Sequence, residues 1–224
     1  MREAYQSDLR HLVDDLVDMA SMVESALSDA TDALLDGDLA LAERVVAADP
    51  HIDERQLDLD AKSVELLARQ SPVATDLRLL VASLRMSSSL ERMGDLCAHV
   101  ALVARRSHPE LAVPEQHREQ IRRMSDLALA ALRDAAQVIS DRDLALAAQV
   151  EKNDDELDEL QQEIAREIGK GEGYTNTQIV DLTLLIRFYE RLGDHAVSLV
   201  RRVGFLVTGD AVDTLSQATD VTEF

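Results

Sequence analysis

Four pairs of acidic residues recur in the sequence with a spacing of four positions. Residues four apart share one face of a helix, where two like charges destabilise an isolated helix by about 0.2 to 0.5 kcal/mol. A divalent metal ion, an arginine or solvent must therefore compensate them. Hard ions such as Mg²⁺, Mn²⁺ and Ca²⁺ take carboxylate oxygens, and two antiparallel helices that each carry one pair could supply four ligands to one site. The pairs are Asp49 with Asp53, Glu91 with Asp95, Asp154 with Asp158, and Glu190 with Asp194.

The pairs are related by an internal repeat. The segment Asp-Gly-Asp-Leu-Ala-Leu-Ala at 36–42 returns 105 residues later as Asp-Arg-Asp-Leu-Ala-Leu-Ala at 141–147, and at this offset Asp49 and Asp53 match Asp154 and Asp158. Glu-Arg-Met-Gly-Asp at 91–95 returns 99 residues later as Glu-Arg-Leu-Gly-Asp at 190–194. Each half of the chain therefore carries both kinds of pair, which favours two related metal sites.

A solvated surface is the alternative interpretation of the acids. Because 43 of the 224 residues are Asp or Glu, chance alone produces many pairs of this spacing. Asp49 could also cap a helix that begins at Pro50, a common first helical residue. Gly94 and Gly193 support a metal site to a modest degree, because a glycine inside a helix costs about 1 kcal/mol relative to alanine and indicates a close approach to the backbone. Tight helix packing would explain both glycines equally well.

Other catalytic chemistry is weakly supported. None of the six histidines follows a glutamate by three residues, so the Glu-x-x-His pairs of di-iron bundles are missing. His99 and His195 are interpreted as helix-face residues with ordinary hydrogen bonds. Cys97 is expected to be a buried, unreactive thiol. The glycines of 169–173 lack the spacing of a phosphate-binding loop and are interpreted as a helix end and turn.

Helices must position these residues. Aromatic residues make up 3% of the chain, and its composition and three-to-four-residue apolar periodicity favour long helices over sheets. We expect an all-α protein of two tandem, pseudo-symmetric three-helix bundles, one in residues 1–107 and one in 115–208, with a flexible tail at 209–224. The expected helices are about 9–36, 39–69 with a kink or a new helix start at Pro50, 77–106, 115–140, 143–170 and 175–208.

Charge restricts the partners. The chain has 23 Lys and Arg against 43 Asp and Glu, a net charge of −20, which repels nucleic-acid phosphates and anionic lipids. The longest stretch without a formal charge, 96–104, has nine residues, whereas a membrane-spanning helix needs about 20 apolar ones. With one cysteine and no visible secretory signal, the expected location is the cytoplasm, and the membrane is reached only through partners.

Two motifs resemble the PhoU family of phosphate-uptake regulators. They are Leu-Glu-Arg-Met-Gly-Asp at 90–95 and Tyr-Glu-Arg-Leu-Gly-Asp-His-Ala at 189–196, accompanied by Asp-Leu-Arg at 76–78. The resemblance covers about residues 5 to 208. It implies a non-catalytic, cytoplasmic negative regulator of phosphate uptake and phosphate-starvation signalling. Its implied partners are the ATPase subunit of the phosphate ABC transporter and a sensor histidine kinase.

The resemblance also implies metal binding, with Mg, Mn, Zn or Fe as ions found in the family. Carried over by motif, the ligands are Asp49, Asp53, Glu91, Asp95, Asp154, Asp158, Glu190 and Asp194. Leu-Cys follows Asp95 in the first half, whereas His-Ala follows Asp194 in the second. Equal metal occupancy of both sites therefore does not follow. A homodimer is the simplest closed assembly. The alternatives are a metal-free helical adaptor and a carboxylate-bridged metalloenzyme.

Overall fold

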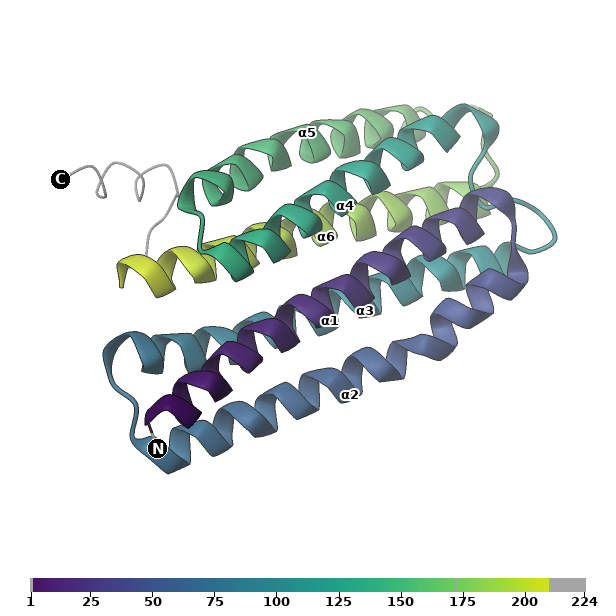
Figure 1. Ribbon diagram of the computed structural model, residues 1–224. Helices are drawn as coiled ribbons and strands as arrows, with labels where there is room; N and C mark the ends of the chain where they lie inside the picture. Colours follow the sequence, from purple (N-terminus) through teal and green to yellow (C-terminus); the bar gives the residue numbers. More distant parts are fainter. Residues whose placement is uncertain (1, 172, 210–224) are drawn as a thin grey trace.

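The computed structural model describes residues 2–171 and 173–209, and within them the chain is all-α (Figure 1). Six α-helices and one short 3₁₀ turn, η1, form two consecutive three-helix bundles, which confirms the expected fold class. The elements are α1 (Arg2–Asp36), α2 (Leu39–Gln70), α3 (Ala74–Ser107), η1 (Glu115–His117), α4 (Arg118–Asp141), α5 (Leu144–Ile168) and α6 (Asn176–Thr208). Apart from Gly209, the segment expected to be a flexible tail lies outside the described residues.

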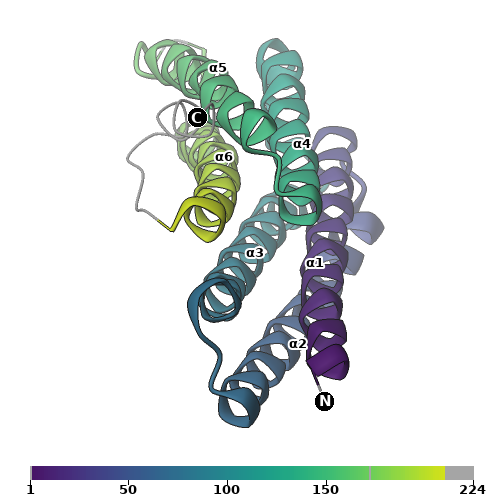
Figure 2. The same cartoon turned by 60° about the vertical axis from the view of Figure 1, so that its left-hand side comes forward.

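The two bundles lie side by side through four of the helices. Helix α1 packs on α4, and α3 packs on α6, while α2 contacts α1 and α3 and α5 contacts α4 and α6. Figures 1 and 2 therefore show α2 and α5 at opposite outer edges of the molecule. Each acidic pair on α2 or α5 faces a third helix, α3 or α6, that belongs to the same bundle.

The repeated Asp-Leu-Ala-Leu-Ala segment begins the second helix of each bundle. The Asp38 carboxylate accepts a hydrogen bond from the backbone N–H of Leu41 at 2.9 Å, and Asp143 accepts from Ala145 and Leu146 at 2.9 and 3.0 Å. Such N-caps satisfy backbone donors that have no partner within the helix. The repeated Asp-Leu-Ala-Leu-Ala segment thus fixes where α2 and α5 begin, and with it the positions of their acids along each helix.

A new helix start at Pro50, one of the two outcomes expected there, is wrong. Helix α2 runs through Pro50 without a break, so Asp49 lies inside a helix and does not cap a new one. Proline removes one backbone hydrogen bond, but Val45 and Ile52 on either side of it are both buried in the same core. Their burial keeps the two parts in one helix and leaves the Asp49 carboxylate available for other contacts.

A buried group of hydroxyls joins the bundles. The Thr31 hydroxyl of α1 lies 2.9 Å from the Ser125 hydroxyl of α4 and 2.8 Å from the Tyr189 hydroxyl of α6. All three residues are buried, and Arg122 of α4 donates to Asp32 of α1 beside them. Cys97 is buried as expected. No helix in the described part of the chain is long and apolar enough to cross a membrane.

Candidate metal centre

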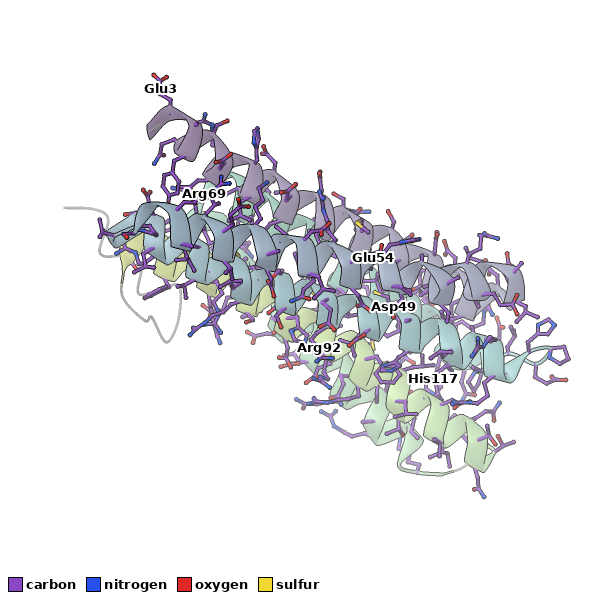
Figure 3. The ribbon with its side chains drawn as sticks, turned by 90° about the horizontal axis from the view of Figure 1, so that it is seen from below. Glu3, Asp49, Glu54, Arg69, Arg92 and His117 are labelled. Atoms are coloured by element: carbon purple, nitrogen blue, oxygen red, sulfur yellow. The ribbon has the colours of Figure 1, made fainter. Side chains whose placement is uncertain are left out.

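Three of the four acids predicted in the first bundle come together between α2 and α3. Asp49 and Asp53 of α2 and Asp95 of α3 each offer a carboxylate oxygen, and these three oxygens lie within 4.8 Å of one another. Two oxygens bound to one ion are separated by at most twice the metal–oxygen distance, about 4 to 5 Å for Mg²⁺ or Ca²⁺. The three aspartates therefore fit a single hard cation with little rearrangement. Figure 3 views this region from the α2 side, with Asp49 and Arg92 labelled.

Electrostatics at this cluster favour an added positive charge. The pKa of Asp49 is raised, first by partial burial and then by the charges of Asp53 and Asp95, with His99 acting in the opposite direction. Asp49 also borders a mostly apolar cavity of about 390 Å³ whose walls include Met22. Repulsion and desolvation disfavour three ionised carboxylates in this place, and a proton or a metal ion relieves both effects.

Glu91, the fourth predicted ligand, lies beside the cluster but outside the set of three. Burial and the charge of Asp95 raise its pKa, while Arg92 lowers it. The Arg92 guanidinium lies 3.4 Å from Glu91 and 2.7 Å from Asp95. The structure thus places an arginine at the edge of the acids. The sequence suggested that an arginine, a metal ion or solvent compensates the acids. Arg92 does so for Glu91 and Asp95, whereas Asp49 and Asp53 require a metal ion or solvent.

The second bundle brings its acids into electrostatic contact without forming a comparable set. Among the described residues, only the cluster in the first bundle has three ligand atoms within 4.8 Å. Asp154 nevertheless has its pKa raised to about 7, first by burial and then by Asp158, Asp194 and Glu190. The Oε2 atom of Glu190 is buried and has no hydrogen-bond partner. An unsatisfied buried carboxylate oxygen is costly, and a bound cation would satisfy it.

Both bundles match one known domain family. Residues 16–104 and 121–203 of the chain each match the PhoU domain. The chain belongs to the PhoU family. A phosphate-specific transport system accessory protein PhoU homolog 1 from Mycobacterium leprae is 39% identical over 210 residues, which cover 93% of this chain and 95% of that protein. PhoU homolog 2 of Mycobacterium tuberculosis is also 39% identical, over 93% of this chain and 99% of its own length.

Solved PhoU structures share the fold. The crystal structure of PhoU from Pseudomonas aeruginosa superimposes with a TM-score of 0.87 at 27% identity, covering 92% of this chain and all of that one. The PhoU regulatory protein from Streptococcus pneumoniae gives a TM-score of 0.84 at 25% identity and covers 93% of this chain and 99% of its own. The two tandem bundles of this PhoU protein are therefore the architecture of the family.

Sequence reasoning missed the arginine of the second bundle. Arg187 of α6 is ion-paired with Glu190 three residues later, on the same helix face. At the matching position of the first bundle, 99 residues earlier, the chain has Ser88. The two PhoU halves thus bring an arginine to their acids from different places, Arg92 in the first and Arg187 in the second. The spacing of three residues between Arg187 and Glu190 could have predicted this ion pair from the sequence.

The two histidines beside the motifs differ in their surroundings. His99 stacks on Phe188 of the other bundle, with ring centroids 5.4 Å apart. The pKa of His195 is lowered by burial and then by the charge of Arg191, so this ring is held in its neutral form more readily than a free histidine. His99 thus helps to join the two halves of PhoU, whereas the hydrogen bonds expected for both histidines stay predictions.

Proposed function

We propose that this PhoU protein restrains phosphate uptake and phosphate-starvation signalling by contacting the ATPase subunit of the phosphate ABC transporter and a sensor histidine kinase in the cytoplasm. The observation that carries the proposal is the match to accessory proteins of phosphate-specific transport over 93% of the chain. The net charge of −20 disfavours nucleic acid and anionic lipid as direct partners. The homodimer expected from the sequence stays a prediction.

We further propose that the acids bind Mg, Mn, Zn or Fe ions, which fix the surface that partners contact. The close oxygens of Asp49, Asp53 and Asp95 support a site in the first bundle. The buried, unpartnered Oε2 of Glu190 and the raised pKa of Asp154 support one in the second, together with Asp158 and Asp194. A cation there would neutralise repulsion across each helix pair and hold the second and third helices at a fixed distance.

A regulatory role fits these sites better than a catalytic one. The close cluster contains aspartates alone. Metal-dependent hydrolases and oxidases commonly hold their metal through histidine ligands, which this cluster does not include. A metal-free helical adaptor is the second candidate, because Arg92 and Arg187 already neutralise part of each acidic group.

Affinity capture tests the regulatory role and the metal together. The wild-type chain and the Asp95→Asn/Asp194→Asn variant are used as bait in lysates of phosphate-replete and phosphate-starved cells, with and without a chelator. Glu43→Gln/Glu163→Gln removes two exposed acids from α2 and α5 and is the matched control. We expect the wild-type chain and the control variant to capture the transporter ATPase or the kinase. Chelator or the double Asn substitution should reduce the amount that is captured.

The outcomes separate the candidates. Capture that is insensitive to chelator and to the Asn substitutions would support the metal-free adaptor. Reproducible absence of both partners, under either phosphate condition, would contradict the regulatory proposal itself. Metal analysis of the purified chain then decides whether the acids bind an ion at all.

A further inference from the structure

The outer face of α2 carries a stripe of exposed apolar side chains. Leu57 and Val64 are 64% and 58% exposed, and Ala61 and Ala68 between and beyond them are also exposed. Their spacing of four, three and four residues is that of the seam of a coiled coil. The stripe spans about 17 Å of helix at about 1.5 Å per residue. Single exposed apolar residues are normal on protein surfaces, but a seam of alternating large and small ones is suited to a second helix.

No described element covers this outer stripe of α2. Among the described elements, helix α2 makes its main contacts with α1 and α3, through its opposite face, where Ile52, Leu59 and Leu66 are buried. In Figures 1 and 2, α2 forms the outermost edge of its bundle, with no helix beyond it. Within residues 2–171 and 173–209, the outer stripe is therefore left open.

The fold does not require the outer stripe, because the second bundle lacks it. At the repeat offset of 105 residues, Gln162 and Arg166 of α5 take the places of Leu57 and Ala61, and Val64 matches Gly169, the C-cap of α5. The core-facing positions keep their apolar character in both bundles, with Leu157 and Ile164 buried in α5 at the places of Ile52 and Leu59. The repeat thus preserves the inner face of the helix and changes the outer one, which indicates a separate use for the outer face of α2.

Both edges of the outer stripe are acidic. On a helical projection Glu54, Asp58 and Glu65 follow one edge and Asp53 and Asp60 follow the other. Arg55 and Lys62 lie further round the helix, where they pair with Asp15 of α1 at 3.1 and 2.7 Å. Arg69 pairs with Glu65. The net charge beside the stripe is therefore negative.

This charge pattern excludes a second copy of α2 as the preferred occupant. In an antiparallel pair each edge faces its own copy, and in a parallel pair it faces the opposite edge; either arrangement opposes acids to acids. Like charges across an interface disfavour the wrong partner. A helix with an apolar seam and lysine or arginine along its edges satisfies both the seam and the charge.

We propose that the outer stripe of α2 docks a basic amphipathic helix of another protein. The helix would pack large side chains over Ala61 and Ala68 and place its cations beside Asp58, Asp60 and Glu65. The contact assigns a surface and a partner chemistry that the regulatory function does not specify, and it rests on that function only for its biological role.

A defined peptide tests the docking surface on the purified chain. The probe is a fluorescently labelled 18-residue helix with leucine at the seam positions and lysine at the edges, and a scrambled peptide of the same composition has no seam. Fluorescence anisotropy is measured at physiological salt. We expect the seam peptide to bind wild type, and Leu57→Gln/Val64→Gln to weaken its binding at least tenfold. Val180→Gln/Leu184→Gln, which removes two exposed apolar side chains from α6, is expected to leave the affinity unchanged.

Three results would overturn the proposal. They are equal binding of the seam and scrambled peptides, equal binding to wild type and Leu57→Gln/Val64→Gln, and a wild-type dimer in sedimentation that this variant dissociates. The peptide assay contains no transport component, so its failure leaves the regulatory proposal standing. Equally, failure to capture the ATPase or the kinase leaves a positive peptide result intact.

Discussion

The Asp154 side chain lies directly over Gly193. A β-carbon added at Gly193 would come within 2.5 Å of Asp154 Oδ1 and within 2.6 Å of Leu157 Cδ2. In the first bundle the matching Gly94 faces the Ile52 side chain, at 3.0 Å from its Cδ1. In each bundle a glycine of the third helix thus lets a side chain of the second helix pack against its backbone. In the second bundle one of these side chains ends in a carboxylate.

Gly193→Ala is expected to destabilise the protein. The new methyl group displaces Asp154 and Leu157 from their positions, and overpacking of this kind costs about 1 to 3 kcal/mol. The gain of about 1 kcal/mol in helix propensity offsets it in part. Gly94→Ala, whose methyl group meets only the Ile52 side chain and at 3.0 Å or more, is the matched comparison and should lose less. Urea unfolding measures both, and a Gly193→Ala variant as stable as wild type would contradict this account of the glycine.

Asp154→Asn is expected to abolish a pH dependence of stability in the metal-free chain. The pKa of Asp154 in the folded state is raised to about 7, mainly by burial, so the folded chain keeps a proton that the unfolded chain releases. Stability is then full below the unfolded pKa and falls as pH rises toward 7. Asparagine resembles the protonated acid and avoids this loss.

Urea unfolding in chelator between pH 4 and pH 8 measures the effect. The variant should be more stable than wild type at pH 8 and similar to it at pH 4. Glu163→Gln, at an exposed position of the same helix, controls for the loss of one negative charge. A difference between wild type and Asp154→Asn that does not change with pH would contradict the raised pKa.

The helices and the acidic pairs were predictable because both depend on local spacing. Apolar residues three and four apart define a buried face, and the repeated Asp-Leu-Ala-Leu-Ala segment fixes the register of α2 and α5 through the Asp38 and Asp143 caps. Pro50 was misjudged because local propensity is overridden by tertiary burial. Nothing near Pro50 in the sequence shows that Val45 and Ile52 enter one continuous core.

The partition of the acids within each site was not predictable. Spacing placed Glu91 beside Asp95, but which acids a second helix brings into the cluster depends on how α2 crosses α3. Arg92 contacts both of these acids, while Asp49 and Asp53 complete the cluster with Asp95. The same applies to Glu190, which pairs with Arg187 on its own helix and still has a buried Oε2 without a partner.

Added Mn²⁺ or Mg²⁺ is expected to raise the melting temperature of the chain. An ion that binds the folded state at about 100 times its dissociation constant stabilises it by about 2.7 kcal/mol, which is about 5 to 10 °C for a chain of this size. Asp53→Asn should reduce the shift because it removes one of the three close oxygens of the first bundle. Differential scanning calorimetry measures it, with Glu43→Gln as the control, and an equal shift in all three proteins would exclude this cluster.

Thr31→Val is expected to weaken the junction between the bundles. The Thr31 hydroxyl is the common partner of the Ser125 and Tyr189 hydroxyls, at 2.9 and 2.8 Å, and all three residues are buried. Valine keeps the shape but leaves buried polar groups without that partner, which costs about 1 to 3 kcal/mol. Ser21→Ala, which removes an exposed hydroxyl bonded within α1, should cost much less.

A double-mutant cycle shows whether the three hydroxyls act as one network. If they do, Thr31→Val and Ser125→Ala together should destabilise the chain by less than the sum of the two single changes, because the second removes a group that the first has already left without its partner. Strict additivity would mean that Ser125 makes its contribution elsewhere. If Thr31→Val unfolds in two separate transitions where wild type unfolds in one, this contact also makes the two bundles unfold together.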